Sequence, residues 1–344
     1  MLCVLRSDKK LTVAYLHRSM VRSYEELAQD LGIEVTCCIS YSQLQRILKY
    51  IDYQCFNKIN ESFFNQQIEK DASEWYAIDG KELRGSIDGV AGEKRGQSIV
   101  LRTSHSSKQS SILGWYNGSK DSEKPVVSSY FESYDGLTGK YTLDALHLSS
   151  QLATLIAEKG GTYLLQVKAN QKLLLEECKH IDTHLTALYK KKTQEKAHGR
   201  EEIRVGFGYT LNVESLPQRW ATSRVKTLIV VERERKRTKT QRKSKEKSYW
   251  ISNLPINATN FLELFIATRE HWTVEVHNNT RDKQMGEDNL ITRNQKQSRF
   301  ISTCITLAIN LLENQNSENM TILREELAYK YKHVYELFQH KRFL

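Results

Sequence analysis

The sequence predicts an α/β fold in which helices flank a mixed β-sheet. Between residues 76 and 167, five short runs are rich in β-branched and aromatic residues, which is typical of strands. An amphipathic helix is predicted between the fourth and fifth runs, and further helices before and after the sheet. The chain has 344 residues, is 39% hydrophobic and contains only 3 prolines. It is therefore long enough for roughly two domains with a substantial core.

Residues 1–70 are predicted to be helical. Ser23 and Glu26 have the spacing of a capping box, Gly32 follows as a stop, and Ser40 with Gln43 repeats the capping pattern before a second apolar stripe. Two capped helices are consistent with a helix-turn-helix that reads DNA. The favoured interpretation is a pair of helices that packs on the next domain, because their connection is longer than a tight turn.

The order of the predicted strands indicates how the sheet is connected. Leu148, Leu152, Leu155 and Ile156 form the apolar stripe of the helix after the fourth run, so this helix is expected to lead by a right-handed crossover into a parallel strand. Three successive strands followed by strand, helix and strand is the layout of the ribonuclease-H-like fold. The five predicted strands are Tyr76–Asp79, Ser98–Thr103, Ile112–Tyr116, Tyr141–Asp144 and Tyr163–Val167.

Two aspartates stand at the ends of predicted strands. Asp79 closes the first strand before Gly80, and Asp144 closes the fourth. Mg²⁺ takes oxygen ligands and usually uses one or two carboxylates, with waters and phosphate oxygens filling its other positions. The pair therefore predicts a magnesium site that acts on a phosphate-containing substrate.

A third carboxylate is expected from a later helix, predicted around Thr259–His277. Glu275 is predicted to share the apolar stripe of this helix with Trp272, and a buried carboxylate needs a base or a metal as partner. The alternative for Glu275 is a helix-end residue that reaches water. Glu287 and Asp288 are rival candidates for the third ligand, although a solvated turn explains them more simply.

A long segment between the fifth strand and that helix is predicted to be a β-rich insertion at about residues 190–256. Strand-like runs occur at Glu202–Val205, Lys226–Val231 and Tyr249–Ile251, and residues 233–247 form a basic hairpin tip. The tip is either a solvated loop or a surface that contacts DNA phosphates. The formal net charge of +10 favours a polyanionic partner. Residues 71–313 are thus predicted to form one interrupted domain that ends in a core helix at Phe300–Leu312, and residues 314–344 a closing helix around 319–338.

The cysteines and the apolar runs indicate the compartment. The 6 cysteines show no zinc-type spacing, and no apolar run approaches the roughly 20 residues that a membrane span needs. We expect a cytoplasmic protein with reduced thiols and no membrane contact.

Six blocks, in order along the chain, resemble those of one family. They are AIDGKELRGS at 77–86, TLDALH at 142–147, GGTYLLQVKANQ at 160–171, HGREE at 198–202, YWISNL at 249–254 and REHWTVE at 269–275. Over roughly residues 40–313, the chain is similar to the ISAs-type, H-repeat-associated family of DDE insertion-sequence transposases.

This resemblance implies an enzyme that cuts the ends of its own mobile element and joins them to target DNA, with Mg²⁺ or Mn²⁺. Asp79, Asp144 and Glu275 match the three catalytic metal ligands. The expected partners are double-stranded DNA, as terminal repeats and target, and a second copy on paired ends, in the cytoplasm at the nucleoid. The residues expected to contact DNA are Lys168, Asn170, Lys81, Arg84, Arg235, Lys236 and Arg237. Capping of the next helix is the alternative for Lys168 and for Asn170.

The chain departs from the family pattern near the third carboxylate. Val276 stands where relatives usually have Asn, and the segment to Asp282 is about one residue shorter. The amino terminus also begins inside the family's helical region. The alternatives to an active transposase are therefore a catalytically inactive, transposase-derived DNA-binding protein and a ribonuclease-H-like nuclease with other substrates.

Overall fold

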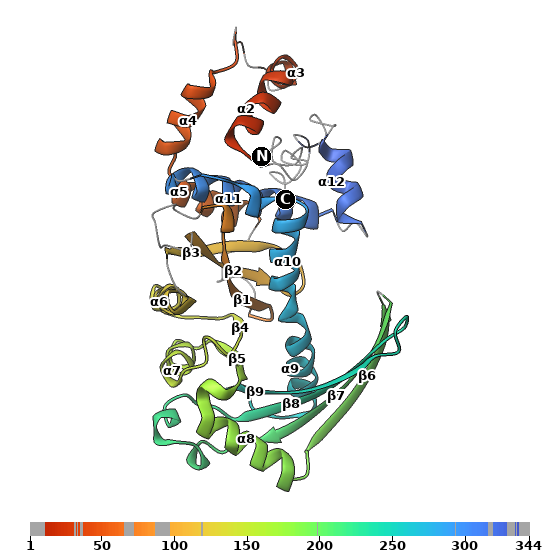
Figure 1. Cartoon of the computed structure of the whole chain (residues 1–344). Coiled ribbons are helices and arrows are strands. Elements are labelled where there is room, and N and C mark those ends of the chain that lie inside the picture. The colour runs from red at the N-terminus through yellow and green to blue at the C-terminus, as the bar shows by residue number, and fades with distance from the viewer. Residues whose placement is uncertain are drawn as a thin grey trace, which may run out of the picture. The chain divides into compact units, whose positions relative to one another are not determined.

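A computed structural model describes residues 11–30, 32, 34, 37–64, 72–86, 97–117, 120–197, 199–292, 294–315, 319–328, 334 and 336. Its strands form a nine-stranded mixed sheet in the order β3-β2-β1-β4-β5-β9-β8-β7-β6 (Figure 1). The chain divides into two compact units. Unit 1 is residues 1–67, 80–127 and 273–344, and unit 2 is residues 68–79 and 128–272. The predicted mixed α/β class is confirmed, and its ribonuclease-H-like assignment stays a prediction, as do the domain boundaries at residues 70 and 313.

The five strands predicted between residues 76 and 167 are all present, and so are the three predicted in the insertion. The strand β6 was missed, because it contains no alternation of apolar and polar residues. The strands are β1 (Trp75–Glu82), β2 (Gln97–Ser104), β3 (Ser110–Asn117), β4 (Lys140–Leu143), β5 (Thr162–Val167), β6 (Tyr189–Ala197), β7 (Arg200–Thr210), β8 (Thr227–Arg237) and β9 (Lys243–Ser252).

The strand directions follow the predicted connections. β4 is parallel to both β1 and β5, and the crossover between β4 and β5 contains the predicted helix. β2 and β3 form an antiparallel hairpin, and β5, β9, β8, β7 and β6 pair antiparallel in that order. The sheet is therefore parallel where β1, β4 and β5 meet and antiparallel elsewhere.

The described helices match most of the predicted ones. The second capping box is present as predicted, with the Ser40 side chain accepting from the Gln43 backbone N–H and the Gln43 side chain accepting from that of Ser40. The part of the closing helix predicted beyond Ala328 lies outside the described residues, apart from residues 334 and 336. The α-helices are α2 (Val13–Arg22), α3 (Tyr24–Asp30), α4 (Tyr41–Tyr50), α5 (Tyr53–Phe63), α6 (Glu123–Glu132), α7 (Ser150–Glu158), α8 (Lys172–His184), α9 (Ala258–Glu270), α10 (Trp272–Lys283), α11 (Gln295–Glu313) and α12 (Met320–Ala328).

The core of unit 1 forms around α11, whose apolar residues from Ile301 to Leu312 are buried. Leu48 of α4 and Phe56 of α5 pack in this core. Arg299 of α11 donates to the Tyr53 hydroxyl at 2.6 Å. The favoured interpretation of residues 1–70, helices that pack on a neighbouring element, therefore holds for α4 and α5.

Unit 2 places helices on both faces of its antiparallel sheet. α9 covers one face, and α8 lies against the other (Figure 1). The aromatic rings of α9 reach the backbone of β7 because this strand has glycines there: a Cβ at Gly208 would lie 2.6 Å from a ring carbon of Phe261. Within the described ranges, no helix is both long and apolar enough to cross a membrane.

Candidate functional site

Asp79 and Asp144 occupy matching positions on neighbouring parallel strands of unit 2. The register pairs Ile78 of β1 with Leu143 of β4, and each aspartate is the next residue in the chain. β1 continues to Glu82, so the prediction that Asp79 closes its strand is wrong. Because β1 and β4 run in the same direction and their pairing ends at Ile78 and Leu143, both half-buried aspartates follow the paired segment on the same side. The hydrophobic runs that precede them explain this placement, because Ala77, Ile78 and Leu143 are fully buried.

The loop that holds Asp144 is fixed by two side chains from the segment after β5. The Asp144 Oδ1 atom accepts from the Leu146 backbone N–H at 2.9 Å. Asn170 donates to the Ala145 carbonyl at 2.6 Å, and Gln171 donates to the Leu148 carbonyl at 3.0 Å. Asn170 does not cap α8, so the capping alternative is wrong. Lys168 is exposed beside these residues, and its ammonium makes no ion pair with any described residue.

His271 lies beneath the same strand, between α9 and α10. Its Nδ1 is 3.0 Å from the Thr142 hydroxyl of β4, and its ring meets the edge of Trp250. Burial lowers the pKa of His271 to about 4, although the nearby charge of Asp144 acts in the opposite direction. The imidazole is therefore neutral at pH 7 and serves as a hydrogen-bonding anchor on β4.

Glu275 lies in the first turn of α10, in unit 1, and its side chain is exposed. The prediction that it shares a buried stripe with Trp272 is wrong, because Trp272 is 50% exposed. The predicted single helix is interrupted at His271, and the buried stripe continues through His271, Val274 and His277. These positions follow Thr268 at steps of three, which shifts the stripe by one residue away from Trp272 and Glu275.

Of the three candidates for the third ligand, Glu287 is the buried one. It lies on the short helix η7 (Glu287–Asn289), with an exposed fraction of 1%. Arg281 forms a bidentate ion pair with Glu287, in which Nε donates to Oε2 at 2.8 Å and Nη2 donates to Oε1 at 2.6 Å. Ser302 also donates to Oε1, and Thr306 accepts from Arg281. Burial alone would raise the pKa of Glu287, but the Arg281 guanidinium holds it below its ordinary value. The solvated turn expected here is therefore wrong for Glu287, whose oxygens are already bonded.

Lys81 joins this group of charges from the end of β1. Its side chain is 6% exposed, and its ammonium lies 2.5 Å from Asp282 and 3.3 Å from Asp288. This burial does not fit the predicted contact of Lys81 with DNA phosphates. The Arg84 side chain, by contrast, is 75% exposed, and its Nε lies 3.8 Å from Asp288 Oδ2, which is a long ion pair. Its contact with DNA stays a prediction.

The described residues contain no group of three or more histidine, cysteine, aspartate or glutamate side chains arranged to hold a metal ion. The paired Asp79 and Asp144 carboxylates are hard oxygen donors of the kind that Mg²⁺ and Mn²⁺ prefer, and one or two such donors suffice when phosphate oxygens and waters complete the coordination. The donor set at this sheet edge therefore fits such an ion.

The basic hairpin has two different faces. Arg233 and Arg235 point towards α9, where Arg233 pairs with Glu246, and Arg235 donates to Glu202 at 2.9 Å. Glu202 is 4% exposed and also accepts from Arg269, so Arg235 is held in an internal network. Lys236 points to the opposite face, and Arg237 is exposed at the strand end.

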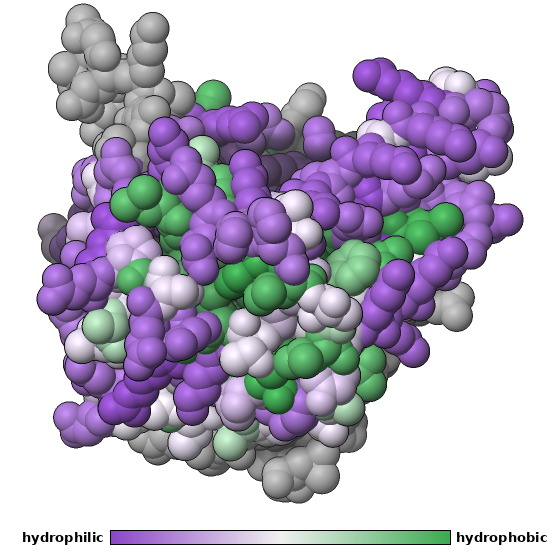
Figure 2. Space-filling view, turned by 90° about the horizontal axis from the view of Figure 1, so that it is seen from below, coloured by the Kyte–Doolittle hydropathy of each residue, from purple (hydrophilic) through white to green (hydrophobic). Residues whose placement is uncertain are grey.

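That opposite face, called the lysine face below, has basic side chains on three strands. Alternation along the paired strands brings together Lys190, Lys192 and Lys196 of β6, Lys236 of β8, and Lys243, Lys245 and Lys247 of β9. Lys245 pairs with Glu234, and Lys247 with Glu232 and Asp182. Lys192, Lys236 and Lys243 make no ion pair with any described residue. In Figure 2, hydrophilic side chains cover almost all of the projecting end of this sheet, at the right of the view.

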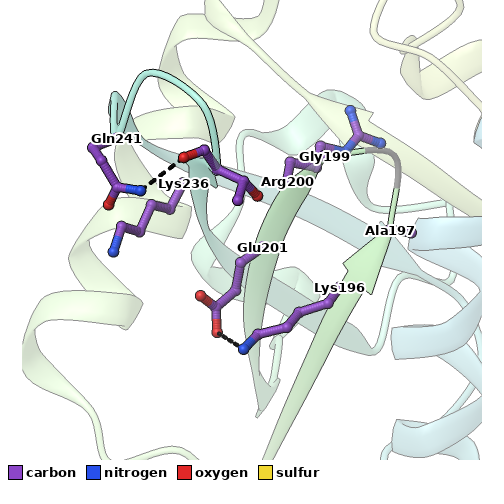
Figure 3. A pocket seen from close by; sticks show the side chains of 8 residues that line it. Lys196, Ala197, Gly199, Arg200, Glu201, Lys236 and Gln241 are labelled. Atoms are coloured by element: carbon purple, nitrogen blue, oxygen red, sulfur yellow. Dashed lines mark hydrogen bonds and ion pairs between the residues drawn. The ribbon is translucent and has the colours of Figure 1, made fainter.

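An open cavity of about 390 Å³ lies at the hairpin end. At the cavity, Lys196 forms an ion pair with Glu201 at 3.8 Å, and Gln241 donates to the Thr238 carbonyl at 2.8 Å (Figure 3). Lys236 extends outwards, and Figure 3 draws no partner for it. The cavity thus has one ammonium available for an anion.

Comparison with known proteins identifies the family. No protein-family model matches the chain. "H repeat-associated putative transposase YhhI" of Escherichia coli K12 is 30% identical over 274 residues, which cover 75% of this chain and 69% of that protein. The chain belongs to the H-repeat-associated transposase family. "Putative transposase YncI" of Escherichia coli O157:H7 is 29% identical over 298 residues, covering 83% of this chain and 72% of that protein. "Putative protein YbfL" of Escherichia coli K12 is 30% identical over 273 residues, covering 75% and 69%.

Two features of this H-repeat-associated transposase were missed in the sequence. His271 stands in the block that resembles the third-carboxylate helix, but a lone histidine has no spacing that marks burial. Arg281 and Glu287 are six residues apart across a helix end, a spacing that no periodic pattern relates. Gly286, with φ of 69°, was the available signal of the sharp turn that brings Glu287 back to Arg281.

Proposed function

We propose that this chain is a DDE transposase that cleaves the ends of its element and transfers the strands to target DNA. The observation that carries the proposal is the pair Asp79 and Asp144, which directly follow the last paired residues, Ile78 and Leu143, of two adjacent parallel strands. Membership of the H-repeat-associated family supports it, because two of the relatives carry the name "putative transposase". Joining two DNA ends requires both to be held together, so two copies of the chain are proposed to act on paired ends.

Asp79, Asp144 and Glu275 would hold Mg²⁺ or Mn²⁺. The bound metal supplies activation of the attacking water or 3′-hydroxyl and charge stabilisation at the leaving oxygen. The three carboxylates supply the hard oxygen ligands. Glu275 is exposed on the first turn of α10, whereas Glu287 is buried and its oxygens are bonded by Arg281 and Ser302. We therefore keep Glu275, rather than Glu287, as the third ligand.

The lysine face is the proposed surface for the DNA backbone. Lys192, Lys236 and Lys243 come from three strands and have no described acidic partner, so their charge remains available to phosphates. Lys168 is proposed as a further phosphate contact next to the Asp144 loop, because it is exposed and unpaired among the described residues. Arg235 is not carried forward as a DNA contact, since Glu202 already binds it.

The test is cleavage of labelled DNA that carries the flanking ends of the element, with Mg²⁺ or Mn²⁺. Asp79→Asn, Asp144→Asn and Glu275→Gln keep the side-chain size and remove the charge, and Asp135→Asn, at an exposed site, is the matched control. We expect each of the three variants to lose cleavage by at least about 100-fold, because even the loss of an outer-shell partner lowers metal affinity by about 10- to 100-fold. Calorimetric titration with Mn²⁺ should show the same loss.

The outcomes separate the candidate functions. Cleavage that survives Glu275→Gln and disappears in Asp288→Asn would move the third ligand to Asp288. Tight DNA binding without metal-dependent cleavage in the parent protein would overturn the transposase proposal and favour an inactive DNA-binding descendant. Cleavage without preference for the element ends would favour a nuclease with other substrates.

A further inference from the structure

Lys81 is a buried cation at the end of β1, enclosed by acids of unit 1. Its ammonium lies 2.5 Å from Asp282 of α10, 3.3 Å from Asp288 and 3.8 Å from Glu287, both of η7. An ammonium removed from water needs such counter-charges, because its desolvation is costly. The lysine is thus held to two separate elements that follow it by some two hundred residues in the chain.

The direction of Lys81 on its strand relates it to the first proposed metal ligand. Side chains alternate along β1, so Asp79 and Lys81 point to one face of the strand and Gly80 to the other. The opposite face at Gly80 is filled by the carboxylate of Glu123, which a Cβ at this position would overlap. Because Glu123 occupies the space beside Gly80, the end of β1 cannot rotate about its own axis towards that face.

The direction of Asp282 on its helix relates it to the third proposed ligand. Asp282 follows Glu275 by seven residues within α10 (Trp272–Lys283), which is two helical turns. Residues with this spacing share one face of a helix. The ion pair between Lys81 and Asp282 therefore connects the end of β1 to the face of α10 that carries Glu275.

We propose that Lys81 is a positioning residue of the proposed transposase site, which holds the strand end after Asp79 against the Glu275 face of α10 through Asp282. This inference rests on the proposed function. Among the described residues, the Lys81 ammonium contacts the three carboxylates and the Glu82 carbonyl, so Lys81 acts through the elements that it joins. A purely structural ion cluster would affect folding alone, whereas a positioning residue also sets the metal affinity of the folded protein.

The experiment compares Mn²⁺ affinity, by calorimetric titration of the full chain, with unfolding by urea. Lys81→Met removes the ammonium and keeps the aliphatic stem, and Lys283→Met, an exposed lysine at the end of α10, is the matched control. We expect Lys81→Met to weaken Mn²⁺ binding by about 10- to 100-fold, as the removal of other supporting side chains around a metal does, and Lys283→Met to leave it unchanged. DNA cleavage should fall by a similar factor.

A double variant separates positioning from folding. Lys81→Met combined with Asp282→Asn removes both charges, so it leaves less unpaired charge buried and should recover stability. Positioning requires that Mn²⁺ affinity stay low in this double variant, and Asp282→Asn alone should also lower it. Parent-like affinity in folded Lys81→Met, or recovery of affinity in the double variant, would overturn the inference. A parent protein that neither binds Mn²⁺ nor cleaves DNA would instead overturn the proposed function on which it rests.

Discussion

Unit 1 and unit 2 each contain a dense group of charges, but only one of the groups is closed to solvent. In unit 1, Arg281 and Glu287 have exposed fractions of 0% and 1%, and their polar atoms bind each other, Ser302 and Thr306. In unit 2, the basic hairpin presents paired arginines on the α9 side and partly unpaired lysines on the other. The same residue types therefore serve packing in one place and remain available to a ligand in the other.

The difference teaches that the partner of a charge, more than its sign, indicates its role. A buried ion pair is costly to break because removal of one member leaves the other charge buried, with neither a counter-charge nor water to solvate it. An exposed pair contributes about 0–1 kcal/mol, because water and salt screen it. The buried cluster is thus expected to govern stability, and the lysine face to govern binding.

The largest effect is expected from Arg281→Met. It leaves the Glu287 carboxylate buried with Ser302 as its close donor, so the free energy of unfolding should fall by about 3–5 kcal/mol. Urea denaturation at pH 7 measures this. Arg281→Met combined with Glu287→Gln should recover part of the loss, and a fall below about 1 kcal/mol in the single variant would contradict a closed cluster.

An intermediate effect is expected from acid, through the same pair. The pKa of Glu287 is lowered in the folded state, so its contribution to stability is complete above its ordinary value of 4.5 and is lost as the pH falls below it. Urea denaturation at a series of pH values should show this fall in the parent protein. Glu287→Gln should show a shallower dependence, and equal slopes in the two proteins would rule out this origin.

The smallest effect on stability is expected at the lysine face. Changing Lys192, Lys236 and Lys243 together to Gln should alter the free energy of unfolding by no more than about 0.5 kcal/mol per site. DNA binding should weaken, and the slope of log affinity against log salt should decrease by about 0.9 for each phosphate that no longer binds a lysine. Fluorescence anisotropy with labelled duplex DNA measures both.

A control triple for the lysine face changes Lys124, Lys226 and Lys296, which are exposed elsewhere. It removes the same net charge, so it accounts for the general attraction of a basic protein to DNA. An equal loss of salt dependence in the two triples would show that the lysine face is not the specific contact surface.

Much of the sheet could be predicted because local patterns specify it. β1, β4 and β5 are short runs of buried apolar residues, and the helix between β4 and β5 has a clear apolar stripe. The matching positions of Asp79 and Asp144 followed from the two apolar runs that precede them, although β1 itself continues past Asp79 to Glu82. By contrast, β6 carries lysines and glutamate on an edge strand, where no buried face imposes alternation, so its sequence resembles a loop.

The third part of the candidate site was harder to predict, because helix phase is sensitive to small interruptions. A one-residue shift of the buried stripe at His271 exposes Trp272 and Glu275 and buries Val274 and His277. Likewise, Arg235 and Lys236 are neighbours in the chain, and only the pairing of β7 with β8 assigns them to opposite faces. Sequence periodicity is averaged over several residues and does not resolve such shifts.

The sequence by itself determined the α/β class, the two aspartates that follow buried apolar runs, the family resemblance and the surplus of basic residues, since each of these depends on local runs or ordered blocks. The tertiary structure alone decided which charges are enclosed. Lys81 is far in the chain from Asp282 and Glu287, and the spacing of those two matches no periodic pattern. All three are charged residues, which are usually exposed to solvent. They are partners because β1, α10 and η7 meet in unit 1, and burial there makes each charge depend on the next.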